Sequence, residues 1–228
     1  MPSTSSKYLL EIACFNVASC IIAQQAGADR IEFCADYEAG GITPTPDHIL
    51  EVRKSVSIPL HVIIRPRSGD FVYSSEDITR MKQSILFCNE HRVDGVVFGV
   101  LNPDKTINTE VNKKLIDLAK PMSVTFHRAI DQCDNIEKAL NALVKLNFDK
   151  VLTSGGKVNA LDGMETLQSF QKKFGDKIII MPGGGIRRLN LEQILEITRC
   201  VEFHSAAIIN HTISAEEIKH LKNILQTA

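Results

Sequence analysis

The chain has 228 residues, of which 44% are hydrophobic and 23% charged, and its formal net charge is −1. This balance is ordinary for a soluble globular protein and excludes the strongly basic surface with which proteins bind nucleic acid or acidic lipid. Apolar runs such as 178–181 are too short to span a membrane, and residues 1–7 lack the apolar region of a signal peptide. We therefore expect one cytoplasmic domain over residues 1–228, with neither nucleic acid nor membrane as a partner.

Short apolar runs alternate with amphipathic stretches along the whole chain. Continuous apolar runs are typical of strands buried on both faces, and strands are predicted at 8–13, 30–34, 59–64, 95–99, 122–126, 150–153, 177–181 and 200–203. Amphipathic helices are predicted between them, most of them opened by capping residues. The helices are expected to begin near Asn16, Thr45, Ser74, Asn108, Asp134, Asn159, Leu189 and Ser214, the last with a capping box to Glu217.

The regular alternation of strands and helices determines the predicted fold. Strands separated by helices imply right-handed crossovers and a parallel sheet. Eight such units close into an α/β fold, a single (β/α)₈ TIM barrel with eight parallel strands surrounded by helices. An open, doubly wound sheet is the rival interpretation, but it usually contains fewer units.

Polar residues at the strand ends are the candidates for chemistry, because active sites of such barrels lie where strands end and helices begin. Two carboxylates, an arginine and a histidine could bind and transform a charged small molecule, or could form a structural ring of ion pairs over the core. His127 is the first choice for proton transfer, since its ordinary pKa lies near 6.5. The predicted catalytic residues are Glu11, Glu32, Arg65 and His127, and Arg128, Ser154, His204 and Ser205 are predicted to bind the ligand.

Two loops are predicted to bind an anion. The segment MPGGGIR at 181–187 contains Gly183, Gly184 and Gly185, and glycines let backbone N–H groups approach a phosphate closely. Phosphate-binding barrels usually have a glycine where His204 stands, so half of that pattern is present, and a tight turn without ligand is the alternative. The basic loop after the third strand adds Arg67 and Asp70 to the predicted anion-binding residues. Alternatively, it is a surface turn in which Arg67 is solvated and Arg65 is paired to a strand-end glutamate.

The six cysteines form no C-x-x-C pair, which favours reduced thiols in the cytosol. Taken together, the strand-end motifs make the chain resemble the CutC copper homeostasis protein family over nearly its whole length. The resemblance rests on GADRIEFC at 27–34, EAGGITP at 38–44, IRPRSGDFVYS at 64–74, VTFHRAID at 124–131, VLTSG at 151–155, MPGGGI at 181–186 and EFHS at 202–205.

The resemblance implies a TIM barrel that takes part in cytosolic copper handling and binds copper as Cu(I), for which soft thiolates are the suitable ligands. It implies Cys34 and Cys14 as the metal ligands. The family's first cysteine often falls at the position of Ala13, and strand alternation turns Cys14 away from the face that Ala13 shares with Glu11. The chain also has Ser68 where the family usually has glycine, and a short segment at 208–213 that predicts a more open mouth.

Two functions therefore remain open. One is a cytosolic copper homeostasis protein that binds Cu(I). The other is an enzyme that acts on a small phosphorylated or carboxylated substrate, in which His127 or Glu32 abstracts a proton and Arg65 stabilises the developing anion. The residues do not choose between isomerase, lyase and hydrolase. The expected partner is a copper ion or a small anionic metabolite, and a homo-oligomer is compatible with the sequence.

Overall fold

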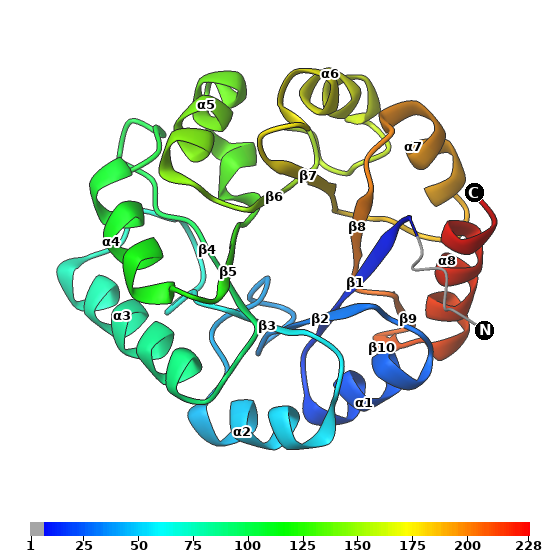
Figure 1. Cartoon of the computed structure of the whole chain (residues 1–228), viewed down its shortest axis with the longest axis horizontal. Helices are drawn as coiled ribbons and strands as arrows, with labels where there is room; N and C mark the ends of the chain where they lie inside the picture. The colour runs from blue at the N-terminus through cyan, green and yellow to red at the C-terminus, as the bar shows by residue number, and fades with distance from the viewer. Residues whose placement is uncertain (1–6) are drawn as a thin grey trace.

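The structure of the chain is a computed structural model that describes residues 7–228, so all but Lys7 of the segment 1–7 lies outside the described residues. Eight parallel strands form one sheet in the order β7-β6-β5-β4-β3-β2-β1-β8, and β7 and β8 meet at its two edges to make a nearly closed barrel (Figure 1). The TIM-barrel prediction is confirmed. The strands are β1 (Leu9–Cys14), β2 (Arg30–Phe33), β3 (Leu60–Ile63), β4 (Gly95–Phe98), β5 (Ser123–Phe126), β6 (Lys150–Thr153), β7 (Ile179–Pro182) and β8 (Glu202–Ser205).

Within residues 7–228, eight helices surround the barrel (Figure 1). None of these helices has the length and hydropathy that a membrane span requires. They are α1 (Val17–Gln25), α2 (Pro46–Ser55), α3 (Ser75–Glu90), α4 (Thr109–Ala119), α5 (Ile136–Leu146), α6 (Met164–Phe174), α7 (Leu191–Thr198) and α8 (Ala215–Thr227). A 3₁₀ helix, η1 (Arg128–Gln132), follows β5. A hairpin of β9 (Ile208–Ile209) and β10 (Thr212–Ile213) follows β8.

Four predicted N-caps, Asn16, Thr45, Ser74 and Asn108, accept backbone hydrogen bonds as expected. Other helix starts were predicted wrongly. Asn135 rather than Asp134 caps α5, by accepting from the backbone N–H of Lys138 at 2.9 Å. Helices α6 and α7 begin at Met164 and Leu191 instead of Asn159 and Leu189.

The predicted capping box of α8 is only half formed. Ser214 accepts from the backbone N–H of Glu217 at 3.1 Å, as expected. The buried Glu217 carboxylate does not return to Ser214, however. It accepts from the backbone N–H of Arg188 at 2.8 Å, and so ties the start of α8 to the loop after β7.

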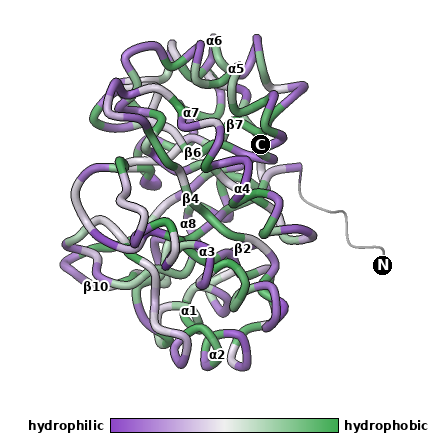
Figure 2. Tube along the Cα trace, turned by 90° about the vertical axis from the view of Figure 1, so that its left-hand side faces the viewer, coloured by the Kyte–Doolittle hydropathy of each residue, from purple (hydrophilic) through white to green (hydrophobic). Residues whose placement is uncertain are grey.

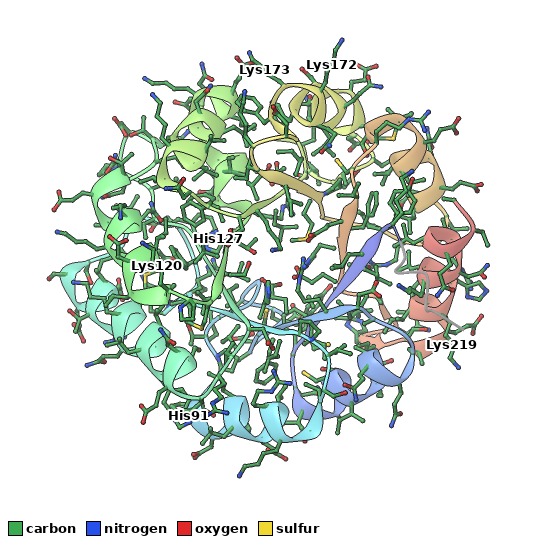
Figure 3. All side chains as sticks on the ribbon, in the orientation of Figure 1. His91, Lys120, His127, Lys172, Lys173 and Lys219 are labelled. Carbon is green, nitrogen blue, oxygen red and sulfur yellow. The ribbon has the colours of Figure 1, made fainter. Side chains whose placement is uncertain are left out.

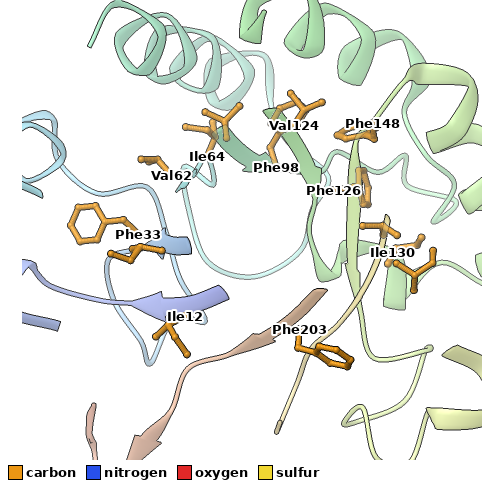
Figure 4. Close-up of a cluster of buried hydrophobic side chains, with 14 of the residues drawn as sticks. Ile12, Phe33, Val62, Ile64, Phe98, Val124, Phe126, Ile130, Phe148 and Phe203 are labelled. Atoms are coloured by element: carbon orange, nitrogen blue, oxygen red, sulfur yellow. The ribbon is translucent and has the colours of Figure 1, made fainter. Parts of the chain in front are cut away.

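Side-chain alternation divides the strand residues between two environments. Outward-facing residues such as Ile12, Phe33, Val62 and Phe126 pack against the helices in the main hydrophobic core (Figure 4). Each such side chain contributes about 1.5–3 kcal/mol through burial. Figure 2 shows the result along the chain, where hydrophobic and hydrophilic stretches alternate.

Three aspartates fix the register of the strands at the end of the barrel where the strands begin. Asp29, Asp94 and Asp149 each precede an even-numbered strand. Each carboxylate accepts a 2.8 Å hydrogen bond from a backbone N–H of the preceding strand, at Leu10, Leu60 and Val124 respectively. These bonds satisfy backbone N–H groups near the N-terminal ends of the strands that would otherwise lack partners.

Candidate functional site

A cavity of about 310 Å³ opens at the C-terminal ends of the strands. His127, which borders it, lies inside the ring of helices, whereas Lys172, Lys173 and Lys219 lie on the outer rim (Figure 3). The predicted residues that line the cavity are Glu32, Cys34, Arg65, His127, Arg128, Gly184, Gly185, His204 and Ser205. Glu11, Arg67, Asp70, Ser154, Gly183 and Cys14 are not among its lining residues.

Glu11 lies beneath the cavity as part of a buried ion network. Its carboxylate accepts from Arg30 Nε at 2.5 Å and contacts His204 Nδ1 at 2.7 Å. Arg30 also pairs with Glu202 at 2.6 Å. Burial alone would raise the pKa of Glu11, but the charge of Arg30 and the contact with His204 hold that pKa well below its usual range. Glu11 is thus an ionised partner that orients His204.

Glu32 occupies the same face of β2 as Arg30 and reaches the cavity. Its carboxylate lies 3.6 Å from His204 Nε2, too far for a hydrogen bond but close enough for an ionic contact. Burial, reinforced by the negative charge of Glu11 and opposed by His204, raises the pKa of Glu32 to about 7. Burial lowers the pKa of His204, but Glu11 and Glu32 outweigh it, so the net shift is upward.

His127 is buried against Gly99 of the loop after β4, where a Cβ atom would lie 2.9 Å from the imidazole ring. Its Nδ1 accepts a hydrogen bond from the backbone N–H of Ala129 at 3.3 Å, and its buried Nε2 has no partner among the described residues. Burial, with a smaller effect of Arg65, lowers the pKa of His127 to about 3. The ring is therefore neutral at physiological pH and carries its proton on Nε2.

Arg65 is held by backbone carbonyls rather than by a strand-end glutamate. Its terminal nitrogens donate to the carbonyls of Ala39 at 2.8 Å, Gly41 at 2.9 Å and Gly69 at 2.9 Å. Its buried Nε lacks a partner among the described residues, and the guanidinium lies 5.0 Å from the centre of the Phe71 ring. The arrangement leaves the Nε–H donor and a buried positive charge beside His127.

The glycine-rich loop brings backbone close to the cavity. Gly184 and Gly185 have φ angles of +94° and +74°, which favour glycine. Their N–H groups have no acceptor among the described residues. Arg187 donates to Ser205 Oγ at 3.3 Å and to the backbone carbonyls of Ile186 and Ile208, so its charge is fixed at the cavity wall.

Arg128 brings the loops after β5 and β6 together. Its side chain lies against Gly184 and donates to Asp131 at 2.9 Å and to Ser154 Oγ at 2.7 Å. Asp131 also accepts from Thr153 and from the backbone N–H groups of Ser154 and Gly156. Ser154 thus helps to position Arg128 from outside the cavity.

Arg67 and Asp70 form a pair outside the cavity. Arg67 contacts Asp70 at 2.8 Å and Asp77 at 3.2 Å, and it stacks over Tyr73. These contacts hold the turn after β3 in front of α3. The solvated-turn alternative describes Arg67 only in part, because 37% of its side chain is exposed while its guanidinium is held by Asp70, Asp77 and the Tyr73 ring.

Cys34 and Cys14 lie on different sides of the barrel wall. The Cys34 thiol lines the cavity, where burial and then Glu32 raise its pKa well above the usual range. Cys14 is fully buried in the core between strands and helices, and burial and Cys20 raise the pKa of its thiol. Ligand-type atoms of Glu11, Glu32 and His204 lie within 4.8 Å of one another. Glu11 is paired with Arg30 and does not line the cavity, so the lining groups with metal-binding atoms are Glu32, Cys34, His127 and His204.

Several buried or half-buried polar residues around the site were missed in the sequence. They are Arg30, His61, Lys150, Glu202 and Asp131. Strand alternation could have identified Arg30, His61 and Glu202, because they share a strand face with Glu32, Arg65 and His204 respectively. Asp131 has no such signal, since it lies in η1 and its role follows from loop geometry.

Comparison with known proteins agrees with the fold and the strand-end motifs. The CutC family model matches residues 8–209. The chain is 41% identical over 200 residues to the human copper homeostasis protein cutC homolog, covering 88% of this chain and 73% of that protein. A CutC family protein of Parabacteroides distasonis is 41% identical over 202 residues, or 88% of this chain and 83% of its own length.

The crystal structure of CutC from Streptococcus agalactiae has the same architecture. It superimposes with a TM-score of 0.83 at 27% sequence identity, covering 87% of this chain and 98% of that one. The family match spans all eight barrel strands and the loops that form the cavity. The chain therefore belongs to the CutC copper homeostasis protein family.

Proposed function

We propose that the barrel mouth binds a small phosphorylated or carboxylated metabolite and performs acid–base chemistry on it. One observation carries this proposal: Glu32, with a pKa of about 7, lines the same cavity as Gly184, Gly185 and Arg187. A group that titrates near neutrality suits proton transfer at physiological pH. Free backbone N–H groups beside a fixed guanidinium suit an anion.

The geometry supports a division of roles. The anionic group lies against Gly184, Gly185 and Arg187. Glu32 carries the proton, and His204, oriented by Glu11, lies 3.6 Å away to balance the charge of ionised Glu32. His127 does not serve as the base, because the N–H of Ala129 occupies its basic nitrogen.

The reaction that fits these roles is removal of a proton from carbon next to a carbonyl group. The C–H bond breaks, the proton moves to the Glu32 carboxylate, and the electron pair moves onto the carbonyl oxygen. The Nε2–H of His127 and the Nε–H of Arg65 are unpartnered donors for that oxygen. Where that carbon also carries a hydroxyl, transfer of the hydroxyl proton to the enolate oxygen and return of the Glu32 proton to the former carbonyl carbon complete an isomerisation.

The test measures binding and proton exchange separately. Calorimetry with inorganic phosphate measures the anion site. Proton NMR in D₂O then follows exchange of C–H for C–D in a panel of small phosphorylated and carboxylated ketones. Glu32→Gln is expected to keep phosphate binding and to lose exchange by about 100-fold or more. Glu90→Gln, the same substitution on the exposed end of α3, keeps both. Absence of phosphate binding, or equal exchange in Glu32→Gln, contradicts the proposal.

Copper binding is the second candidate, favoured by the family and by the Cys34 thiol in the cavity wall. A Cys14–Cys34 pair is disfavoured by the position of Cys14 in the outer core. We infer that Cu(I) at Cys34 would take its second ligand from His204 or Glu32. A nitrogen or oxygen ligand is less suited to Cu(I) than a second thiolate. The six cysteines are all free, in keeping with the reducing cytosol that we propose as the compartment.

Anaerobic Cu(I) titration against a competing chelator tests this second candidate. Cys34→Ala is expected to abolish stoichiometric binding if the site is at the cavity. Cys88→Ala is the matched control, because it removes an equally buried thiol on α3 that does not line the cavity. Equal copper affinity in wild type and Cys34→Ala rules out the thiolate site.

A further inference from the structure

A second hollow of about 390 Å³ adjoins the cavity. It lies between α1 and the β9–β10 hairpin, which sit side by side next to β1 (Figure 1). Ala13, Phe15 and Tyr37 line both the hollow and the cavity. We propose that this hollow, called the annex below, binds an uncharged apolar group of the ligand whose anionic group lies at Gly184. The inference rests on the proposed function and names its substrate class.

The annex walls are largely apolar. Ala18 and Ile22 of α1 form one side, and Ile208 and Ile213 of the hairpin form the other. Phe15 stands at the junction with the cavity, with its ring centre 5.1 Å from that of Tyr37 at an angle of 78°. Because Tyr37 is 45% exposed, this edge-on aromatic pair borders the junction without sealing it from solvent.

The polar residues of the annex are mostly satisfied within the protein. Asn16 and Ser19 bond to each other in the capping box of α1, in which Ser19 N–H donates to Asn16 Oδ1 at 2.8 Å and Asn16 N–H donates to Ser19 Oγ at 3.1 Å. Thr212 Oγ1 donates to the carbonyl of Ile209 at 3.2 Å. The annex lining includes no aspartate, glutamate, lysine or arginine, and His211 is exposed.

The contrast with the cavity fixes the orientation of a ligand. The cavity lining includes Glu32 and three arginines, Arg65, Arg128 and Arg187. A charged group transferred into the annex would lose hydration without gaining a partner. The charged end of a ligand therefore belongs in the cavity, and its apolar end in the annex.

The β9–β10 hairpin, which forms one side of the annex, is held in place by hydrogen bonding and by packing on the core. Asn210 and His211 adopt φ angles of +49° and +63° at its tip, and the N–H of Ser214 closes its base on the carbonyl of Ala207 at 2.9 Å. Ile213 packs against the main core. The family match ends at residue 209, within this hairpin. The annex is large enough for a phenyl ring, since an apolar cavity of about 150 Å³ accommodates benzene.

The substrate class is thus a small phosphate or carboxylate that carries a phenyl-sized apolar group. The experiment compares calorimetric affinities for inorganic phosphate, methylphosphonate, phenylphosphonate and 2-phenylethylphosphonate. Wild type is expected to bind at least one phenyl probe about tenfold more tightly than methylphosphonate, because the ring is removed from water.

Ala18→Phe is the diagnostic variant, because Ala18 is exposed on α1 and a larger side chain there fills the annex without entering the core. It is expected to abolish the phenyl advantage and leave methylphosphonate affinity unchanged. Gln25→Phe, at the exposed end of the same helix, keeps the advantage.

The outcomes separate this inference from the proposed function. Equal affinity of wild type for phenyl and methyl probes overturns the annex and leaves the anion site standing. A phenyl advantage that survives in Ala18→Phe also overturns it, because the ring then binds elsewhere. Absence of binding for inorganic phosphate and every phosphonate overturns both proposals together.

Discussion

The backbone N–H of Ala129 donates to Nδ1 of His127 at 3.3 Å, and this contact determines which ring nitrogen can carry a proton. Because a backbone N–H can only donate, Nδ1 must be the acceptor, and the neutral ring carries its hydrogen on Nε2. The residue chosen from the sequence as the proton carrier is thereby better suited to donate a hydrogen bond. The carboxyl of Glu32, which lines the same cavity, has the pKa that proton transfer needs.

The first prediction is that His127 remains the neutral Nε2–H tautomer. Its pKa of about 3 lies below the whole pH range 5–9. Nitrogen-15 NMR of histidine-labelled protein is expected to show one ring signal set with unchanged shifts over that range, assigned by its loss in His127→Gln. A titration midpoint near the ordinary value of about 6.5 would contradict the assignment.

The second prediction concerns the buried pair of Glu11 and Arg30. Arg30→Met leaves the Glu11 carboxylate buried without its main counter-charge, and is expected to lower the unfolding free energy by about 3–5 kcal/mol. Removing both charges, in Arg30→Met with Glu11→Met, is expected to cost less than the sum of the single changes. Urea unfolding measures all three.

Arg80→Met is the control for this cycle. Arg80 pairs with Glu76 on the exposed face of α3, where a salt bridge contributes about 0.5 kcal/mol or less. Additive effects at Glu11 and Arg30 would show that the two charges do not stabilise each other, and would refute the network as an energetic unit.

The eight strands could be predicted because each is a short apolar run bounded by turn residues, and their ends identified Glu32, Arg65, His127 and His204 at the mouth. The sequence did not separate Glu11 from Glu32, although both face the barrel interior. Glu11 lies deeper in the barrel than Glu32, and Arg30 forms its hydrogen bond with Glu11. A pairing of this kind depends on strand stagger, because Glu11 lies opposite Arg30 in the β1–β2 register.

Helix starts were predictable where one capping residue preceded the helix, as at Asn16. They failed where two adjacent residues could cap, as at Asp134 and Asn135. The late start of α6 has a different cause. Gly163 lies so close to the carbonyl of Ser154 that a Cβ atom would be 1.9 Å from it, and the loop must fold back on β6 before the helix begins. That close approach is a tertiary contact without periodicity in the sequence.

The third prediction is a loss of stability in acid through His61. Burial lowers the pKa of His61 to about 4 in the folded chain, whereas its ordinary value is near 6.5. As pH falls below 6.5, the unfolded chain binds a proton that the folded chain does not bind until about pH 4. Unfolding free energy should therefore fall by about 1.4 kcal/mol per pH unit from this residue, or about 3 kcal/mol over the window.

Urea unfolding from pH 7 to pH 4.5 checks this slope. His61→Gln is expected to be less stable than wild type at pH 7 but to lose less stability on acidification, because the variant lacks the histidine whose pKa is lowered by folding. His48→Gln, at an exposed position on α2, keeps the wild-type slope. Parallel slopes in wild type and His61→Gln would mean that His61 does not resist protonation.

The fourth prediction compares two glycines with the same backbone requirement. Gly184 and Gly27 have φ angles of +94° and +97°, so alanine at either position costs about 1 kcal/mol or more of strain. At Gly184 the new Cβ atom lies 3.0 Å from Arg128 Nη1 at the cavity, whereas at Gly27 it meets Lys222 at 3.6 Å, away from the site. Both variants are expected to lose similar stability in urea, but Gly184→Ala alone should weaken phosphate binding, by about tenfold, in calorimetry. Equal phosphate affinity in the two variants would show that the glycine-rich loop serves the fold and does not hold the anion.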